Sequence, residues 1–535
     1  METRPTGSVA AAQAVPGTAR SPRRWWALIA IAASVLVVGL DLTVLNLALP
    51  SIAVSLHAST GDLQWFSDAY SLVIAALILP AGMLGDRYGR KKVLLLALVL
   101  FGVSSAACAY AASTGELIAA RAVLGVGASA IFPLSLSVIP VMFGDEERQK
   151  AIALMAAATM LSFPIGPIVG GYLLDHFWWG SVFLINVPVV VLAVGAVAVL
   201  LPESRSSSRP RIDVAGVLVS SAGLIALTYG FIKAGQDGWT DPAALATIVA
   251  GVVLLVLFVL VERLVTARGA QPLVELPLFE SPGFRWGTIL VTLVSFAMFG
   301  LFFAMPQYFQ DVRGANALGS GLRLLPMVAG MLVGMVAGTR LQAPRGSAAG
   351  GTAGPRTIIA AGYLIMAIAM ALGAFTSLAS STGYALAWVA VAGLGTGLVM
   401  PAAMNISLGA LSAERSGSGS AVIAAMRQVG SVIGVAVLGT VISNAYSSGV
   451  DVTGLPPAAG ALARSSVAGG VTVARTIGSP TLLDSVRTAF IHGMDVMLWT
   501  CGGIAVGCAV LALLFLPRRQ AGADAAAIDP ASISV

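Results

Sequence analysis

Three ionisable residues lie inside long apolar stretches of this sequence. They are Asp41 in "GLDLTVLNLALP", Asp68 in "QWFSDAYSLV" and Arg121 in "LIAARAVLGVG". An ionised Asp or Arg at the centre of a bilayer costs roughly 2.5–3.5 kcal/mol on insertion scales, so such residues usually face the interior of a helix bundle and serve a function. Two carboxylates beside one guanidinium have pKa values that are pushed apart. One carboxylate can then bind and release a proton while the other stays ionised, which is a plausible proton-binding arrangement.

The expected depths of these residues would let them meet. At 1.5 Å per residue, Asp41 lies about 21 Å above the cytoplasmic start of its span, and Arg121 lies about 9 Å below the outer end of its span. Asp68 falls within about one turn of the outer end of the second span. If the spans are neighbours, all three form one proton-binding cluster. The alternative is a structural ion pair, with Asp68 merely at the membrane interface.

A short loop, "GMLGDRYGRKK" from Gly82 to Lys92, concentrates charge in an otherwise apolar region. It holds one acid, Asp86, and the cations Arg87, Arg90, Lys91 and Lys92. Cations beside a membrane span fix its orientation, so membrane topology alone would explain their presence at any position of the loop. It does not explain the acid or the spacing of the glycines.

Later spans carry weaker signals. In "LSFPIGPIVGGYLL", Ser162, Gly166 and Gly170 form a small-residue stripe against which another helix can pack closely, and Pro167 invites a bend. Arg427 in "AAMRQVGSVIG" either lines a central cavity, favouring a neutral or acidic compound, or braces helices. The aromatic and methionine side chains of "SFAMFGLFFAMPQYF" either form an adaptable cavity wall or pack against helices and lipid. The candidate substrate-contacting residues are Asn46, Tyr70, Phe303, Gln307, Arg427 and Gln428.

The elements that must position these residues follow from composition. The chain has 535 residues, of which 57% are hydrophobic and 10% charged, whereas soluble domains are roughly 45–50% apolar and about 25% charged. The apolar residues form continuous blocks of about 20 residues, the length of a membrane-spanning helix, and do not alternate as in a barrel. We predict an all-α polytopic membrane protein with spans near 27–49, 65–85, 92–112, 115–137, 150–173, 181–201, 212–233, 244–266, 286–308, 320–341, 357–378, 384–407, 419–445 and 491–516.

The basic residues provide an independent test of these fourteen spans. With a cytoplasmic N-terminus, 22 of the 30 Lys and Arg residues fall on the cytoplasmic side, six on the outer side, and Arg121 and Arg427 within spans. This asymmetry obeys the positive-inside rule and predicts that both termini are cytoplasmic. The apolar N-terminal run is too long for a signal peptide and is expected to stay as the first span.

Several function classes are disfavoured. The net charge of +6 is distributed over block edges, which argues against nucleic-acid binding. The three cysteines lie inside apolar blocks, and the three histidines have no ligand spacing, so neither disulfides nor a metal are expected. There is no P-loop sequence and no catalytic constellation. We expect neither an enzyme nor an ATP-driven pump.

Taken together, the motifs resemble the major facilitator superfamily, in particular its fourteen-span drug:proton antiporters. "GMLGDRYGRKK" fits the family's signature G-x-L-x-D-R-x-G-R-K-x between spans 2 and 3, and "LDLTVLNLALP" fits its first-span motif. "RAVLGVG" fits the span-4 motif, whose Arg the family ties to proton coupling. "SFPIGPIVGG" fits the span-5 antiporter motif, with Ser162 in place of its first glycine, and "FLINVP" is another familiar stretch. The resemblance covers about residues 25–517.

The resemblance implies roles for the signature loop and the span-5 motif. The loop would act as a cytoplasmic latch, in which Asp86 pairs with the other half of the protein when the transporter faces outward. The latch residues would be Gly82, Gly85, Asp86, Arg87, Gly89 and Arg90, and the antiporter-motif residues Gly166, Pro167, Gly170 and Gly171. The corresponding segment in the second half, "TRLQAPRGSAAGGTAGPRTII", is degenerate and lacks an acid, so no strong second latch is expected.

The resemblance also implies a major facilitator fold, with two six-helix bundles and two inserted helices. Its parts would be a cytoplasmic tail at 1–24, a bundle at 25–201, a polar linker at 202–211, the inserted helices at 212–266, a second bundle at 284–517 with an external loop at 446–489, and a tail at 518–535.

The implied function is a monomeric, proton-driven antiporter that exports hydrophobic drugs, antiseptics or antibiotics across a bacterial-type cytoplasmic membrane. Its energy source would be the proton gradient, with no cofactor. A proton-coupled nutrient importer of the same fold is the alternative. A non-transporting sensor or scaffold is a third possibility, but it would not need charges inside the membrane.

Overall fold

The described part of the chain is built from helices. The computed structural model describes residues 23–205, 213–268, 272–342, 354–411 and 416–516. Fourteen helices in these ranges are long and apolar enough to cross a membrane, with α6 and α7 counted as one. The predicted fold class and number of spans are therefore confirmed.

The helices fall into three groups along the chain. The first bundle consists of α1 (Arg23–Leu56), α2 (Thr60–Tyr88), α3 (Arg90–Ala109), α4 (Thr114–Met142), α5 (Asp145–His176), α6 (Ser181–Leu184) and α7 (Asn186–Leu200). The inserted pair is α8 (Val214–Asp237) and α9 (Pro242–Ala267). The second bundle consists of η1 (Leu276–Glu280), α10 (Pro282–Gln307), η2 (Tyr308–Val312), α11 (Ala317–Leu341), α12 (Pro355–Gly373), α13 (Thr382–Gly409), α14 (Ser416–Gly449), α15 (Pro457–Ser465), α16 (Val467–Thr476) and α17 (Pro480–Phe515).

Short polar residues begin many of these helices. Ser59 accepts a hydrogen bond from the Asp62 N–H, and the Asp62 carboxylate accepts one from the Ser59 N–H, which closes a capping box at the start of α2. The side chains of Ser113, Asp241, Asn316 and Ser381 each accept a hydrogen bond from a first-turn N–H and so cap α4, α9, α11 and α13. Each cap satisfies a backbone donor that the first helical turn leaves free, so these local sequences set where the spans begin.

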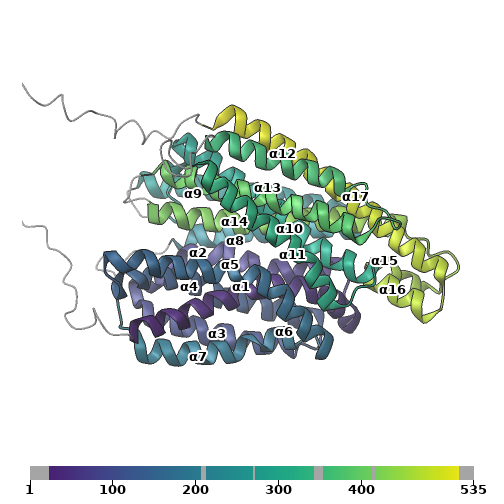
Figure 1. The fold of residues 1–535 in the computed structure, drawn as a ribbon, viewed down its shortest axis with the longest axis horizontal. Helices are drawn as coiled ribbons and strands as arrows, with labels where there is room; N and C mark the ends of the chain where they lie inside the picture. The colour runs from purple at the N-terminus through teal and green to yellow at the C-terminus, as the bar shows by residue number, and fades with distance from the viewer. Residues whose placement is uncertain (1–22, 206–212, 269–271, 343–353, 412–415, 517–535) are drawn as a thin grey trace, which may run out of the picture.

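The two bundles lie side by side, and their long helices run in roughly the same direction from one end of the molecule to the other. In Figure 1, α1 begins and α17 ends at the left, here called the terminal end, whereas α15 and α16 lie at the right, here called the distal end. With few exceptions, the buried apolar side chains form one core cluster from α1–α7 and another from α10–α17. Each bundle thus has its own core.

The bundles are linked at their distal halves. The Gln64 side chain on α2 donates hydrogen bonds to the backbone carbonyls of Val435 and Ala436 on α14, at 3.1 and 2.8 Å. Four further hydrogen bonds join the bundles. They run from Thr60 to the Ser465 carbonyl, from Gln310 to the Leu47 carbonyl, and from the Asn316 side chain and the Ala317 N–H to Asp175. Among the described residues, these inter-bundle hydrogen bonds all lie toward the distal end. The conformation is therefore closed at that end.

The inserted helix α8 covers the seam between the bundles. It contacts both α2 and α14, while α9 packs against α8. Thr440 on α14 donates a 2.7 Å hydrogen bond to the Phe231 carbonyl on α8, and Asn444 donates one to the Ala234 carbonyl at 3.1 Å. Helix α8 therefore touches both halves of the protein.

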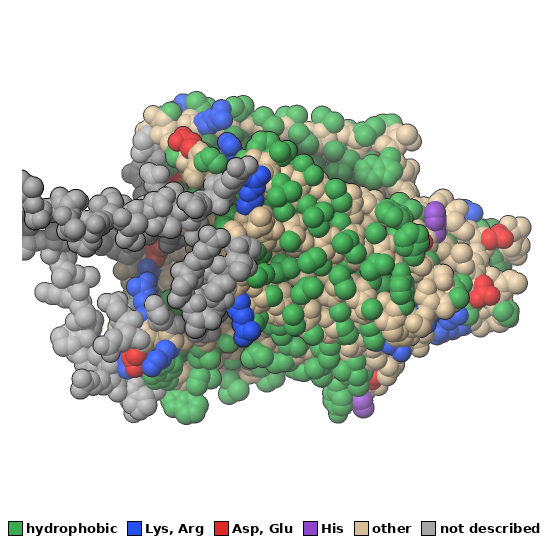
Figure 2. Space-filling model, turned by 45° about the horizontal axis from the view of Figure 1, so that its top comes forward, with side chains coloured by type: hydrophobic (Ala, Val, Ile, Leu, Met, Phe, Trp, Pro, Cys, Tyr) green, Lys and Arg blue, Asp and Glu red, His purple; other side chains and the backbone are tan. Residues whose placement is uncertain are grey.

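The exterior matches a membrane protein. Figure 2 shows hydrophobic side chains over the middle of the visible face, with charged side chains gathered toward its two ends. Exposed leucine and valine side chains such as Leu96, Val103, Leu192 and Val253 contribute to the apolar surface. Because lipid tails solvate apolar groups and exclude charge, this distribution suits a bilayer.

One expectation about secondary structure is wrong. The segment 446–489, expected to be a loop, contains the end of α14, the short helices α15 and α16 and the first residues of α17. Ser466 caps α16 by accepting from the Gly469 N–H, and Val467 and Val471 are buried in the core of the second bundle. Buried valine and alanine side chains thus support short helices without a span-length apolar block.

Some expected segments lie outside the described residues. They are residues 1–22 of the N-terminal tail, 206–211 of the polar linker, 343–353 of the degenerate second signature and the C-terminal tail 518–535.

Candidate functional site

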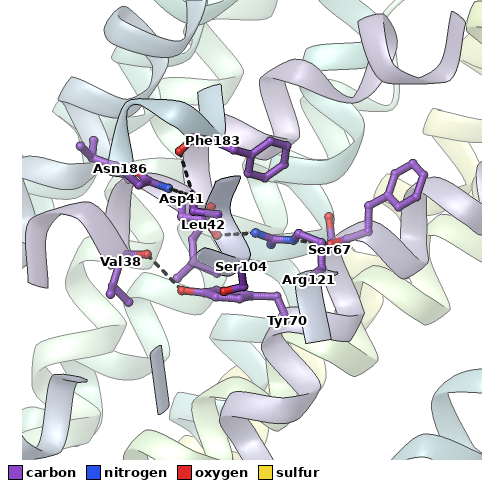
Figure 3. A network of polar contacts seen from close by, with 12 residues as sticks. Val38, Asp41, Leu42, Ser67, Tyr70, Ser104, Arg121, Phe183 and Asn186 are labelled. Atoms are coloured by element: carbon purple, nitrogen blue, oxygen red, sulfur yellow. Dashed lines mark hydrogen bonds and ion pairs between the residues drawn. The ribbon is translucent and has the colours of Figure 1, made fainter. Parts of the chain in front are cut away.

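Arg121 and Asp41 form an ion pair inside the first bundle, between α4 and α1 (Figure 3). The Arg121 Nη1 donates to Asp41 Oδ2, and its Nε donates to the Phe66 carbonyl at 2.9 Å. The guanidinium also lies over the Tyr70 ring, 4.3 Å from its centroid, in a cation–π contact. Charge, hydrogen bonds and an aromatic face together hold this cation away from water.

Close helix packing positions the pair. A Cβ on Gly125 of α4 would lie 2.7 Å from the Tyr70 carbonyl of α2, so α4 can approach α2 only with a glycine there. The Tyr70 hydroxyl donates a 3.4 Å hydrogen bond to the Val38 carbonyl of α1. These contacts bring α1, α2 and α4 together, which is the condition under which the buried charges could meet.

Asp68 does not join this pair. Phe66 and Tyr70 both touch Arg121, so they mark the face of α2 that points toward it. Asp68 lies two residues from each, about 200° around the helix, and therefore points away. Its side chain is buried, and neither carboxylate oxygen has a hydrogen-bond partner in the described part of the chain. The expected cluster of two acids and one Arg is reduced to one acid and one Arg.

A small cavity, lined by both polar and apolar side chains, lies where this pair meets the second bundle. Its volume is about 10 Å³, the space needed for about one water molecule. The lining residues come from both bundles and are Leu42, Leu45, Asn46, Ser67, Ser71, Arg121, Phe299, Ser431 and Val435. The Arg121 Nη2 is buried without an acceptor among the described residues. A water molecule here could link Arg121 to hydroxyl groups of α2 and α14.

The candidate substrate residues are placed differently from one another. Asn46 lines the cavity, and Tyr70 lies beneath Arg121. Phe303 and Gln307 are buried in helix packing, and Gln307 donates to the Phe303 carbonyl of its own helix at 2.9 Å.

The two α14 candidates are half-buried. Arg427 is one turn from Ser431, which lines the cavity, and its Nε has no acceptor in the described part of the chain. Gln428 is half-buried, and its carbonyl accepts from Ser431 at 2.9 Å.

The candidate list did not include the three serines that line the cavity, Ser67, Ser71 and Ser431. Ser67 and Ser71 are four positions apart, so they share one face of α2. Ser431 stands four positions after Arg427 and shares its face of α14. Helical spacing was the available signal for these serines. Phe299 belongs to the stretch "SFAMFGLFFAMPQYF", for which a cavity wall was one of the two expectations, and it does line the cavity.

The signature loop is bound to its own bundle. Asp86 pairs with Arg90 at 2.8 Å, and Arg90 also donates to the Ser137 carbonyl of α4 at 2.9 Å. The Lys91 Nζ donates to the Ala198 carbonyl of α7 at 2.7 Å. The loop lies at the terminal end, and its hydrogen bonds among the described residues go to the first bundle and to Glu203 and Ser204, which directly follow that bundle.

The loop glycines have different roles. Gly89 has φ +118°, a conformation that favours glycine, and it forms the turn between α2 and α3. A Cβ on Gly85 would overlap the Leu134 side chain of α4. A Cβ on Gly82 would meet only Pro133, at 3.9 Å, and Arg87 is an exposed residue that contacts the neighbouring Tyr88 ring.

The span-5 glycines face two different helices. Gly166 and Gly170 pack against Thr43 and Val44 of α1 in the same bundle. A Cβ on Gly171 would lie 2.5 Å from the Leu318 Cα of α11, and the Pro167 carbonyl approaches Gly321 of that same helix. This stripe therefore supports both the first bundle and its contact with the second.

A metal site is not formed by the described residues, in which no group of three or more His, Cys, Asp or Glu side chains could hold an ion. Cys108, Cys501 and Cys508 are free and buried.

Comparison with known proteins identifies the class. The family model described as Major Facilitator Superfamily matches residues 31–435. The multidrug efflux pump LfrA of Mycolicibacterium smegmatis is 34% identical over 488 residues, covering 90% of this chain and 94% of that protein. The tetracenomycin C resistance and export protein of Streptomyces glaucescens is 31% identical over 511 residues, covering 93% of each chain.

A puromycin resistance protein of Streptomyces alboniger is 32% identical over 522 residues, covering 95% of each chain. Among solved structures, a bacterial homologue of the human lysosomal transporter Spinster, in an inward-facing and occupied conformation, matches with a TM-score of 0.65 and 17% identity over 93% of this chain and 98% of that one. At that identity the match concerns the fold alone.

These matches and the fourteen candidate spans define a multi-pass membrane transporter. The chain belongs to the major facilitator superfamily, as its motifs predicted.

Proposed function

We propose that this protein exports hydrophobic drugs, antiseptics or antibiotics across a bacterial-type cytoplasmic membrane in exchange for protons. The observation that carries the proposal is the buried Asp41–Arg121 pair beside a polar cavity shared by both bundles. The names of the relatives, which denote multidrug efflux and resistance to or export of single antibiotics, support the direction and the substrate class.

In this proposal, Asp41 carries the exchanged proton. When Asp41 is ionised it pairs with Arg121, and when it is protonated the pair weakens and the guanidinium must find other acceptors. The cavity between the bundles places such acceptors, the hydroxyls of Ser71 and Ser431, near Arg121. Protonation would therefore change the contacts between the bundles, which is what alternating access requires.

The distal closure fits one state of that cycle. The hydrogen bonds between the bundles lie in their distal halves, and Asp86 pairs inside its own bundle. If the terminal end is cytoplasmic, as the positive-inside asymmetry predicts, this conformation faces inward. The opposite state would bring the signature loop against the second bundle. We propose that the protein works as a monomer, because each bundle has its own core and both bundles belong to one chain.

The test uses everted membrane vesicles made acid inside and a panel containing puromycin, methyl viologen and lipophilic dyes. Addition of a substrate should collapse the pH gradient in the wild type and leave it intact in Asp41→Asn. The control is Asp237→Asn, which removes an acid from another helical ion pair, with Lys233 at 2.5 Å, and should behave as the wild type.

The alternative, a proton-coupled nutrient importer, predicts the opposite direction of net substrate movement. Uptake of substrate into whole cells, driven by the proton gradient, would support the importer and contradict export. A gradient collapse that persists in Asp41→Asn would leave export possible and remove Asp41 as the exchanged group.

A further inference from the structure

Asp68 lies at a junction of three helices that belong to three different parts of the protein. Gln64, one turn toward the distal end, links α2 to carbonyls of α14. One turn in the other direction, Leu72 shares a small apolar cluster with Leu224 of α8 and Val432 of α14. Asp68 is therefore enclosed by the first bundle, the second bundle and the inserted helix.

The contacts between α2 and α8 identify the residue opposite Asp68. The rings of Trp65 and Tyr229 lie 6.5 Å apart, and a Cβ on Gly61 would overlap the Gln236 side chain farther toward the distal end. The two helices run in opposite directions, so one turn from the Leu72–Leu224 layer leads to Asp68 on α2 and to Thr228 on α8. Contacts between α2 and α8 therefore lie on both sides of Asp68 and Thr228, with Trp65–Tyr229 toward the distal end and Leu72–Leu224 toward the terminal end.

Two buried polar groups of this layer lack partners. Asp68 is 1% exposed and Thr228 is 0% exposed. Both Asp68 oxygens and the Thr228 Oγ1 have no hydrogen-bond partner in the described part of the chain. A buried ionised carboxylate without a donor is far more costly than a neutral acid. The neutral acid can donate one hydrogen bond, and a hydroxyl at the same level can accept it.

We propose that Asp68 and Thr228 form a second proton-binding site, which is occupied while the seam between α2, α8 and α14 is closed. This inference rests on the proposed proton exchange and extends it to the inserted helices. Asp68 carries the proton, and Thr228 is a positioning residue that accepts its hydrogen bond. Loss of the proton leaves a carboxylate that must reach water, so it favours opening of the distal end.

We attribute the pH dependence of the opening to Asp68 because the other charged and titratable groups on the helices packed around it are paired or lie farther away. On α8 they are Tyr229, which faces Trp65, and Lys233, which pairs with Asp237 at 2.5 Å. On α14 the cation is Arg427, about two turns toward the terminal end. On the opposite face of α2, Asp41 is already paired with Arg121.

The experiment measures the opening directly, without substrate or gradient. Spin labels are placed through Gly115→Cys on α4 and Gly383→Cys on α13, two first-turn positions at the distal end. A Cβ at position 115 meets no atom within 4 Å, and one at position 383 meets only the Ser381 hydroxyl, at 3.8 Å. The native cysteines are buried, so brief labelling favours the introduced thiols. Distances between the labels are recorded by pulsed electron resonance in lipid nanodiscs from about pH 5 to pH 9.

The wild type should show the short distance at low pH and the long distance above a midpoint. Asp68→Asn, which cannot lose a proton, should keep the short distance throughout. Thr228→Val removes the acceptor that favours the protonated form, so the proton leaves more easily and the midpoint moves to lower pH by about half a unit to one unit. Thr247→Val on α9, whose hydroxyl bonds its own helix at 2.9 Å, is the matched control and should not move the midpoint.

Three results would overturn the inference. They are a wild type whose distance is independent of pH, an Asp68→Asn variant that still opens at the wild-type midpoint, and a Thr228→Val midpoint equal to that of the control. Failure of the exporter proposal is separate, because it would show in the vesicle assay while the Asp68-dependent distance change remained.

Discussion

Arg121 and Asp41 are 80 positions apart in the chain and form an ion pair whose side chains are only 0% and 1% exposed. Removal of one partner from such a pair costs about 3–5 kcal/mol, because the other charge stays buried without compensation. The same pair is the proposed site of proton exchange. Its contributions to stability and to coupling can therefore be separated by comparing single and double substitutions.

Arg121→Gln should lower the stability of the protein by about 3–5 kcal/mol. The double variant Asp41→Asn/Arg121→Gln buries no charge and should recover most of that loss, yet it should remain inactive in proton exchange. Thermal unfolding in detergent and the vesicle assay measure the two properties. A double variant as unstable as the sum of its single variants would show that the pair does not interact as described.

Asp86→Asn should abolish transport while leaving membrane insertion intact. Its ion pair with Arg90, at 2.8 Å, joins the last turn of α2 to the first residue of α3 in a partly exposed position and contributes little to folding. The proposed latch, in contrast, needs its charge in the other state. Transport rate and protein level in the membrane are the measurements, and Asp237→Asn, which also breaks an exposed i,i+4 pair, is the control. An undiminished transport rate in Asp86→Asn would contradict the proposed latch role of Asp86.

The signature-loop glycines should respond differently to alanine. Gly89→Ala should destabilise the α2–α3 turn by about 1–2 kcal/mol, because φ +118° is unfavourable for a residue with a Cβ. That Cβ would also lie 2.6 Å from a Glu203 oxygen. Gly82→Ala should retain stability, because only Pro133 lies near, at 3.9 Å. Thermal unfolding of both variants tests this, and equal losses would contradict it.

Gly171→Val should prevent closure of the distal end. The added atoms would collide with the α11 backbone at Leu318, and overpacking costs about 1–3 kcal/mol. That energy shifts the equilibrium between the closed and the open state by about 5- to 150-fold. The spin-label distance between positions 115 and 383 should lengthen, and transport should fall. Gly507→Val on α17, where no atom lies within 4 Å of the added Cβ, is the control. A label distance equal to that of the Gly507→Val control would contradict the proposal that the α5–α11 contact closes the distal end.

Much of the candidate site could be predicted because its signals are local. The charges of Asp41, Asp68 and Arg121 stand out in apolar blocks, and the expected depths of the first and third are compatible with their observed pairing. Asp68 could not be placed in the same way. Which way it points depends on the rotation of α2 about its own axis, and that rotation is set by the packing of Tyr70 against Arg121.

The sequence by itself determined the class of protein, the fourteen spans and the acids and cations inside them. These are local consequences of bilayer thickness and of the cost of burying charge. Only the tertiary structure decided that Asp68 faces α8 and α14, that Ser67 and Ser431 share a cavity, and that α15 and α16 are helices. Each depends on contacts between residues far apart in the chain, and helix packing alone brings them together.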